Sequence, residues 1–407
     1  GSCSFPNNLI NSGIKEADMV VAVTGSDEIN IVSCLISKVL SRKVKTIARI
    51  RESAYLKDRT KRAMEEGVIP VDIIVSPEQL ITDYIQALIE TPGSLQVLEF
   101  GDGLLNLVGA RAVKGGPLIG HEIGDLKKHM PNVDTRVAAI FRAGGAIIPK
   151  GTTTVEAGDE VFFIARRKDA IKVINEMRKK EDPYKYVIIA GGGKIGSGLA
   201  QQIEHNHRVK VIESNSDRAK EISEILISSI VLEGNVSDKS LLHEENVEKS
   251  DVFVAVTNDD EANIMSCMLA KEMGAHKVIA LINNEAYVDL VQERGIDVAI
   301  APSQITIGTF LSELAGDEVV KIHSLRKGAA EAIEIIVKAS TNGKEDVIGK
   351  ELGNIKLPVG ATIGAIIRKN RAKIAHDDVK LREHDHVVLF LINKKILPQV
   401  KEIFSPS

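Results

Sequence analysis

Residues 186–200 read YVIIAGGGKIGSGLA, and this stretch decides the fold. An apolar run leads into Gly191, Gly193 and Gly196, spaced G-x-G-x-x-G, and a helical pattern follows. The first glycine of such a loop permits a tight turn, the second lets the backbone approach a phosphate, and the third allows close packing of helix on strand. The stretch therefore predicts the opening strand, turn and helix of a doubly wound parallel Rossmann sheet, with phosphate groups at the helix N-terminus.

An acidic residue follows at the spacing expected in this fold. Residues 209–212 form a second apolar run, and Glu213 ends it, 22 residues after Gly191. A carboxylate at this point accepts hydrogen bonds from both ribose hydroxyls and repels a 2′-phosphate, so NADP is disfavoured. Ser214 and Arg218 follow in the next turn, and Arg218 is open to two interpretations, a phosphate contact or a surface arginine.

Further candidates stand where later strands end, because ligands bind at the carboxyl ends of strands in such sheets. Within the glycine loop, we expect Lys194 and Ile195 to contact the nucleotide. After the third strand the candidates are Asn235 and Val236, and after the fourth strand they are Thr257, Asn258, Asp259 and Glu261.

The chain contains an internal repeat, which is searched for first because it sets the architecture. Residues 17–34 read ADMVVAVTGSDEINIVSC and residues 250–267 read SDVFVAVTNDDEANIMSC, an offset of 233 positions (267 − 34). The match continues from KTIARIRESAY at 45–55 to KVIALINNEAY at 277–287. Two tandem units are the simplest account, and the first-copy counterparts of the site are Thr24, Asp27 and Glu28.

The two copies differ at their starts. Between Tyr186 and Asp251 there are 65 positions, but only 17 residues precede Asp18, a difference of 48 (65 − 17). We therefore expect the first Rossmann unit to be N-terminally truncated and to lack its glycine loop, which would leave only a residual site there.

Each Rossmann unit is followed by a segment of different character. Short apolar runs at 95–100, 137–142 and 161–165 alternate with glycine-rich turns, a pattern typical of a small α+β domain. The sequence predicts four domains: a partial Rossmann unit at 1–93, a small domain at 94–180, a complete Rossmann unit at 183–316 and a second small domain at 317–407. The charged run RKKED at 178–182 is predicted to be a solvated linker.

Composition limits the class of protein. Hydrophobic residues make up 44% and aromatic residues 3%, with no tryptophan, so the cores must consist of aliphatic side chains, as in parallel sheets buried on both faces. A formal net charge of −4 gives no overall attraction to nucleic acid or anionic lipid. The apolar runs are far shorter than the roughly 20 residues that span a bilayer, so we expect no direct membrane insertion.

With these motifs assembled, the chain resembles the tandem RCK family, which combines KTN (TrkA-N) and TrkA-C domains and regulates Trk-type potassium uptake systems. The resemblance covers the whole chain and rests most specifically on residues 186–196, 211–214, 251–263, 18–30 and the Gly-Asp-Glu turn at 158–160. Asn235 departs from the family, whose members often carry aspartate there, and this could retune adenosine recognition.

The resemblance implies NAD(H), or ATP and ADP at the same site, as effectors. It implies a peripheral position on the cytoplasmic face of the membrane, bound to a Trk-type potassium-translocating subunit, and a homo-oligomer, either a dimer or a tetrameric ring. It also implies a dimer interface on the helix after the last Rossmann strand of each unit. An ordinary core helix that packs within its own chain would account for the apolar residues of these helices equally well. These residues are Leu80, Ile81, Tyr84, Ile85 and Leu88 in one unit, and Ile305, Ile307, Phe310, Leu311 and Leu314 in the other.

The sequence contains few residues that would indicate an enzyme. Cys34 and Cys267 occupy equivalent helix positions and read as small buried side chains, while His376, His384 and His386 read as a polar turn. We expect no catalytic residue and no metal site. Two alternatives stay open, an NAD-dependent oxidoreductase and an oligomeric scaffold whose nucleotide site is structural; the duplicated small domain favours the sensor, since a substrate domain has no reason to occur twice.

Overall fold

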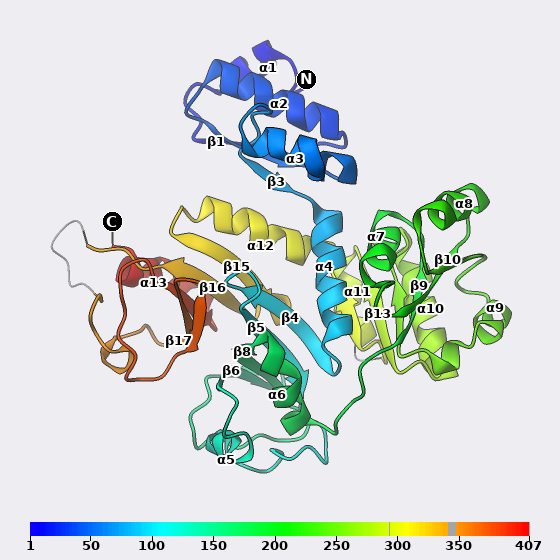
Figure 1. Ribbon diagram of the computed structural model, residues 1–407. Coiled ribbons are helices and arrows are strands. Elements are labelled where there is room, and N and C mark those ends of the chain that lie inside the picture. Colours follow the sequence, from blue (N-terminus) through cyan, green and yellow to red (C-terminus); the bar gives the residue numbers. More distant parts are fainter. Residues whose placement is uncertain (293, 341–346, 407) are drawn as a thin grey trace. The chain divides into compact units, whose positions relative to one another are not determined.

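The structure is a computed structural model that describes residues 1–292, 294–340 and 347–406 (Figure 1). It divides into two compact units, Gly1–Thr82 and Asp83–Ser407. Among the described residues, none of the helices combines the length and the apolar character needed to cross a lipid bilayer.

The first unit is a half-size parallel α/β layer. Within residues 1–82, all of which are described, the sheet has the order β1-β2-β3, formed by Met19–Ala22, Lys45–Arg49 and Ile73–Val75. Helices α1 (Pro6–Asn11), α2 (Asp27–Leu40) and α3 (Asp58–Glu65) accompany it. Helix α2 begins at Asp27, because the Ser26 hydroxyl caps it by accepting a hydrogen bond from the Ile29 amide (3.2 Å).

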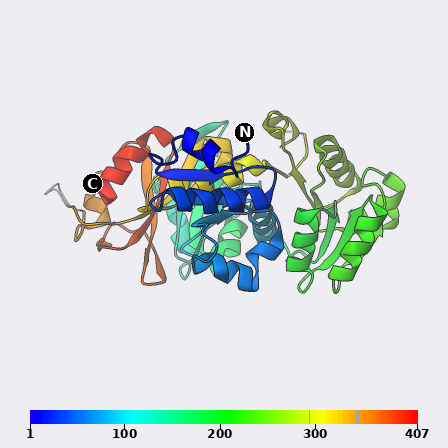
Figure 2. The same cartoon turned by 90° about the horizontal axis from the view of Figure 1, so that it is seen from above.

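The second unit contains a complete Rossmann sheet, flanked by helices on both faces (Figure 2). Its strand order is β11-β10-β9-β12-β13-β14, all parallel, so the order reverses between β9 and β12. Such a reversal is the point where ligands bind in doubly wound sheets. The strands are Tyr186–Ala190 (β9), Arg208–Glu213 (β10), Ile230–Glu233 (β11), Val252–Ala255 (β12), Lys277–Leu281 (β13) and Val298–Ile300 (β14); the helices are Lys194–Ile203 (α7), Ser216–Ile225 (α8), Lys239–Glu244 (α9), Asp260–Met273 (α10) and Glu285–Gln292 (α11).

The two sheets correspond strand by strand as the repeat predicts. Strands β1, β2 and β3 match β12, β13 and β14, and α2 matches α10, each of 14 residues. Helix α1 precedes β1 as α9 precedes β12. Within residues 1–82, β1 is an edge strand, whereas its counterpart β12 pairs with β9.

Two small domains of one antiparallel topology complete the second unit. Their strand orders are β4-β5-β8-β6-β7 and β15-β16-β19-β17-β18. The first contains Ser94–Phe100 (β4), Leu105–Arg111 (β5), Thr135–Arg142 (β6), Gly145–Ile147 (β7) and Glu160–Arg166 (β8), with helices Leu126–His129 (α5) and Ala170–Met177 (α6). The second contains Val319–Leu325 (β15), Ala330–Ile336 (β16), Ala361–Arg368 (β17), Arg371–Ile374 (β18), His386–Leu391 (β19) and helix Leu397–Phe404 (α13).

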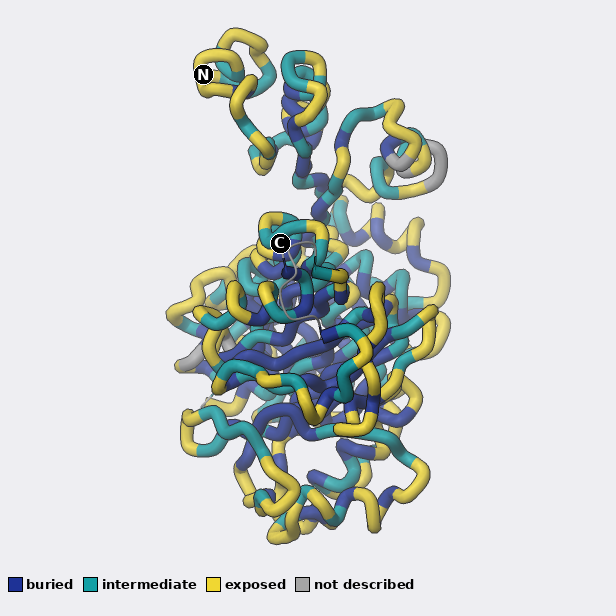
Figure 3. Tube along the Cα trace, turned by 90° about the vertical axis from the view of Figure 1, so that its left-hand side faces the viewer, coloured by how far each residue is buried: buried dark blue, intermediate teal, exposed yellow. Residues whose placement is uncertain are grey.

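The small domains share one core. Phe100 and Phe162 of the first pack in the same buried cluster as Leu325 and Phe390 of the second, and Figure 3 shows the buried residues in dark blue. Each domain also buries one aspartate under an arginine: Arg142 donates two hydrogen bonds to Asp159 (2.8 Å each), and Arg368 likewise holds Asp385 (2.7 and 2.6 Å). The aspartate of the Gly-Asp-Glu turn in the first copy therefore forms a structural ion pair.

The connecting helices α4 (Pro77–Glu90) and α12 (Pro302–Leu314) both begin at proline, which the first turn of a helix tolerates because its N–H groups have no partner within the helix. The apolar residues of α4 are covered within the chain: Ile81, Ile85 and Leu88 are at most 2% exposed. Those of α12 are not, since Ile307, Leu311 and Leu314 are 51%, 41% and 61% exposed.

The charged run at 178–182 is not wholly a solvated linker, and the prediction is wrong for two of its side chains. Arg178 donates to the carbonyl of Gly93 (3.2 Å), and Glu181 accepts from the Tyr184 hydroxyl (2.9 Å). The reason is tertiary: the chain passes between the carboxyl end of α4 and the start of β13, where these charges find fixed partners. Burial opposes ionisation of Glu181, but Arg178, Tyr184 and His276 outweigh it and lower the pKa of its carboxyl group.

Candidate functional site

The glycine loop lies at the reversal point of the six-stranded sheet. Gly191 follows β9 with φ of 104°, a conformation that L side chains rarely adopt, and a Cβ there would lie 3.0 Å from the Thr257 amide nitrogen. A Cβ on Gly196 would lie only 1.9 Å from the carbonyl oxygen of Gly191. Gly193 caps α7, and a Cβ there would meet nothing within 4 Å. The first and third glycines are therefore steric requirements, and the second leaves open space beside the helix N-terminus.

The carboxylate of Glu213 is fixed beside this loop. One of its oxygens accepts a hydrogen bond from the Gly192 amide (2.8 Å), and the other accepts from the Asn215 amide (2.9 Å) and the Ser214 hydroxyl (3.4 Å). Each carboxylate oxygen offers two lone pairs, so acceptor capacity remains for ribose hydroxyls. Sequence reasoning identified Glu213 and Ser214 but not Gly192, which holds the carboxylate in place.

Arg218 bridges the loop and α8. Its Nε donates to the carbonyl of Gly192 (3.3 Å), and its guanidinium lies 3.1 Å from the Glu221 carboxylate. The guanidinium is therefore held next to the glycine loop.

The residues after β11 border the same region. The amide of Gly234 donates to the carbonyl of Glu213 (2.9 Å), which ties the ends of β10 and β11 together. Asn235 is exposed and its side chain accepts from the Ser237 amide (2.9 Å), while Val236 is buried in the core. Of these two candidates, only Asn235 presents polar atoms to solvent.

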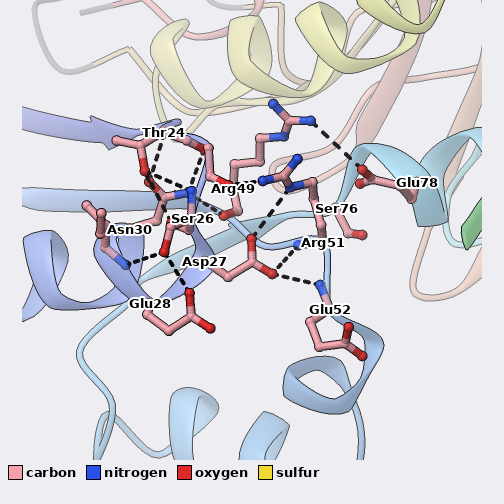
Figure 4. Close-up of polar contacts among 12 residues, drawn as sticks. Thr24, Ser26, Asp27, Glu28, Asn30, Arg49, Arg51, Glu52, Ser76 and Glu78 are labelled. Carbon is pink, nitrogen blue, oxygen red and sulfur yellow. Dashed lines mark hydrogen bonds and ion pairs between the residues drawn. The ribbon is translucent and has the colours of Figure 1, made fainter. Parts of the chain in front are cut away.

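An asparagine that sequence reasoning missed fixes the threonine after the fourth strand. In the first unit Asn30 accepts from the amide (2.8 Å) and hydroxyl (2.7 Å) of Thr24 and donates to the carbonyl of Arg49 (2.8 Å). Asn263 binds Thr257 in the same way and donates to the carbonyl that ends β13 (2.9 Å). Figure 4 shows the first of these clusters. The asparagine of the repeated D-E-x-N motif therefore links the ends of two neighbouring strands by hydrogen bonds.

The aspartate of that motif also binds the backbone after the neighbouring strand. One oxygen of Asp27 accepts from the amides of Arg51 (2.9 Å) and Glu52 (2.8 Å), and Asp27 is 8% exposed. Asp260 accepts from the amides of Asn283 and Asn284 after β13, one at each carboxylate oxygen (2.8 Å each). Asp27 was predicted as part of a residual ligand site, and in the structure its Oδ2 is occupied by the backbone.

The remaining candidates lie on the rim. The Ser26 hydroxyl donates to Glu28 (2.6 Å) and lowers the pKa of that carboxyl group. Asp259 caps α10 through the Ala262 amide (2.8 Å). Asn258, Glu261 and Lys194 are exposed, and Ile195 is partly buried.

The first unit differs in charge at its strand ends. Arg49 and Arg51 stand where the second unit has Leu281 and Asn283, and their side chains are 33% and 32% exposed. Glu78 lies 3.8 Å from Arg49 (Figure 4). At these two aligned positions, guanidinium groups are present in the first unit and absent from the second.

The cysteines and histidines outside this region are engaged in separate structural contacts. Burial raises the pKa of Cys34 to about 12 and also raises the pKa of the equivalent Cys267. His376 pairs with Asp134 (2.9 Å) and His386 with Glu334 (2.7 Å), so these histidines do not converge. The described residues contain no group of three or more side chains placed to hold a metal ion.

Comparison with known proteins assigns this architecture. The TrkA-N domain family matches residues 1–77 and 187–302, and the TrkA-C domain family matches residues 107–178. The Trk system potassium uptake protein TrkA of Halomonas elongata is 50% identical over 404 residues, which cover 99% of this chain and 88% of that protein.

This chain belongs to the TrkA family. The TrkA protein of Vibrio alginolyticus is 47% identical over 407 residues, covering 100% of this chain and 88% of that protein. The predicted fold class, tandem Rossmann and TrkA-C domains, is confirmed.

Solved structures share the TrkA family fold at low sequence identity. The RCK domain of GsuK superposes with a TM-score of 0.60 at 17% identity, covering 98% of this chain and 84% of that one. The GsuK channel bound to NAD superposes with a TM-score of 0.59 at 16% identity, covering 98% and 69%.

Proposed function

We propose that this chain is the regulatory subunit of a Trk-type potassium uptake system and that its second Rossmann sheet senses a nucleotide. Relatives 50% and 47% identical carry the name Trk system potassium uptake protein TrkA, which supports the assignment to potassium uptake. The single observation that carries the sensing role is the pairing of the Glu213 carboxylate with the Gly192 amide (2.8 Å) at the reversal point of the sheet.

The residues fit an adenine dinucleotide. The open space at Gly193 admits a phosphate to the N-terminal end of α7, where the helix dipole favours negative charge. Glu213 would accept the ribose hydroxyls and Arg218 would neutralise a phosphate oxygen. NAD(H) is the ligand we propose, a choice supported by the NAD-bound GsuK channel of similar fold. ATP and ADP share the same ribose and phosphate groups and would use the same contacts.

We propose a sensor rather than an enzyme. Cys34 and Cys267 have raised thiol pKa values and hydrogen bond to backbone carbonyls, so neither supplies a thiolate nucleophile at neutral pH. Regulation requires only that a ligand bind two conformations with different affinity, because an equilibrium shifts by that difference and no more.

The proposed setting is the cytoplasmic face of the membrane, in a homo-oligomer that contacts a potassium-translocating subunit. The exposed face of α12 supports self-association: Ile307, Leu311 and Leu314 fall on one side of the helix and remain uncovered within the chain.

Calorimetric titration of the full chain with NADH, NAD, ATP and ADP tests the sensing role. We expect saturable binding at the second sheet, weakened at least about tenfold in Glu213→Ala, because two charge-assisted hydrogen bonds to ribose are lost. The matched control is Glu224→Ala, an exposed carboxylate on α8. Equal affinity in Glu213→Ala and the wild type would refute the assignment, and steady consumption of NADH in the presence of a candidate substrate would refute the non-enzymatic role.

A further inference from the structure

Strand β11 forms an open edge of the second Rossmann sheet. Among the described residues it pairs with β10 alone. Residues 226–232 read LISSIVL, a run without a charge or a proline. Within this run Ile227 is 82% exposed and Ile230 is 53% exposed. An exposed edge strand is a template for pairing with another strand, and native proteins usually block such edges with charged residues or proline. The edge at β11 has neither.

The opposite edge of the same sheet provides an internal comparison. It is formed by β14, whose Val298 and Ile300 are buried within the chain. Aliphatic side chains are therefore covered at one edge of the sheet and open to solvent at the other. Because removing apolar surface from water is favourable, a further strand at β11 would stabilise the sheet there.

The backbone of β11 shows which groups point to the open side. The amide of Gly234, directly after the strand, donates to the carbonyl of Glu213 on β10 (2.9 Å). Alternate residues of a strand bond the same neighbour, so the even-numbered residues of β11 also face β10. The N–H and C=O groups of Val231 and Glu233 therefore point away from β10.

These groups select one way of pairing β11 with itself. In an antiparallel pair, two outward residues that lie opposite each other exchange both of their hydrogen bonds. With Leu232 opposite Leu232 of a second copy, Val231 of each copy lies opposite Glu233 of the other, and all the outward groups are paired. Centring the pair on Val231 instead would place Glu233 opposite Ser229, whose amide already donates to the Glu204 carboxylate (3.0 Å).

The side chains agree with this register. Leu232 meets Leu232, and apolar cross-strand pairs of this kind stabilise a sheet. Ile230 lies opposite Gly234, which has no side chain and leaves room for the isoleucine. Glu233 lies opposite Val231, so the carboxylates of the two copies are not directly opposed. The edge is therefore complementary to itself in hydrogen bonding, in shape and in charge.

We propose that β11 pairs antiparallel with β11 of a second copy of this chain, which joins the two Rossmann sheets across a twofold axis. This surface is different from the exposed face of α12 and depends neither on that face nor on the nucleotide site. Two different twofold interfaces on one chain would together build a tetramer, a common closed assembly.

Amide hydrogen exchange tests the pairing at the strand itself. The N–H groups of Val231 and Glu233 face solvent in the single chain and are hydrogen-bonded in the proposed pair. In the full wild-type chain, exchange at these two amides should slow at least about tenfold between dilute, dissociated protein and concentrated, associated protein. In Ile230→Lys, which places a charge on the edge as other native edges do, this slowing should be lost.

Light scattering coupled to gel filtration measures the assembly in the Leu311→Glu background, in which the α12 face carries a charge. This variant should still form a dimer through β11. Leu311→Glu/Ile230→Lys should dissociate at concentrations at least about tenfold higher than Leu311→Glu does. The matched control is Leu311→Glu/Ile171→Lys, because Ile171 is an isoleucine of α6 that is 38% exposed, and this control should keep the dimer.

Four outcomes would overturn the proposal. These are a monomeric wild-type chain, a monomeric Leu311→Glu chain at concentrations where the wild type associates, equal dissociation of the two double variants, and unchanged exchange at Val231 and Glu233 on association. If α12 is not an interface, Ile230→Lys and Ile171→Lys are compared in the otherwise wild-type chain, and equal masses of these two variants would overturn the proposal in the same way.

Discussion

Gly196 is the residue at which the fold most directly excludes a side chain. Its Cβ would lie 1.9 Å from the carbonyl oxygen of Gly191, a backbone atom that cannot move without opening the loop. Gly196→Ala should therefore destabilise the second unit by about 1–3 kcal/mol, although alanine favours the helix by its intrinsic propensity. Urea denaturation of the variant and the wild type measures the difference.

Gly193→Ala is the control for this substitution. Gly193 has φ of −62° and free space around its Cβ position, so alanine should change the free energy of unfolding by no more than about 0.5 kcal/mol. Equal destabilisation by both substitutions would show that the contact with the Gly191 carbonyl does not decide the result.

The glycine loop and Glu213 could be predicted from sequence because their chemistry is local: the spacing along one strand, turn and helix defines it. The roles of Asn263 and Asp260 could not, because their partners are backbone groups at the end of the neighbouring strand, about 20 residues further along the chain. The repeat of the same residues in Asn30 and Asp27 was the available signal, and it indicates structure as readily as function.

The starts of three helices carry local signals in the sequence. Ser26 caps α2, and Pro77 and Pro302 begin α4 and α12. The strands β5 and β7 were not identified, because their residues lie among glycine-rich turns whose pairing depends on the rest of the sheet. The different burial of α4 and α12 is also tertiary, since both helices carry apolar residues at helical spacing.

The exposed face of α12 predicts self-association at the scale of one helix. Leu311→Glu places a charge in the centre of the patch formed by Ile307, Leu311 and Leu314. Burying an unpaired carboxylate in an interface is costly, so the variant should dissociate at concentrations at least about tenfold higher than the wild type does. Light scattering coupled to gel filtration gives the mass of each species.

Ile225→Glu is the matched control for α12, since Ile225 lies on α8 and is 48% exposed, close to the 41% of Leu311. It should leave the mass unchanged. A wild-type chain that is monomeric, or a Leu311→Glu variant that associates as the wild type does, would rule out α12 as the interface.

At the scale of the whole molecule, one buried lysine joins the second Rossmann sheet to the first small domain. Lys277 begins β13 and is 5% exposed; its Nζ donates to the carbonyls of Leu88 (3.2 Å) at the end of α4 and Ser94 (2.9 Å) at the start of β4. The Tyr184 ring lies 5.7 Å from the same ammonium group. Any movement of β13 relative to α4 must break these hydrogen bonds, so Lys277 couples the sensing sheet to the small domain.

The pH dependence of stability tests whether Lys277 is buried at this contact between the sheet and the small domain. Burial lowers the pKa of Lys277 from 10.5 to about 8, against the opposing charges of Asp297 and Glu181. Between these two pH values the unfolded chain binds more protons than the folded chain, so the contribution of Lys277 to stability rises with pH. The free energy of unfolding of the wild type, relative to Lys277→Met, should therefore increase by about 3 kcal/mol between pH 8 and pH 10.5. The comparison with Lys239→Met, an exposed lysine of the same sheet domain, should show no such change. If the difference in free energy of unfolding between the wild type and Lys277→Met stays constant or falls between pH 8 and pH 10.5, Lys277 is not buried in the folded chain as the structure shows. Another residue would then have to couple the sheet to the small domain.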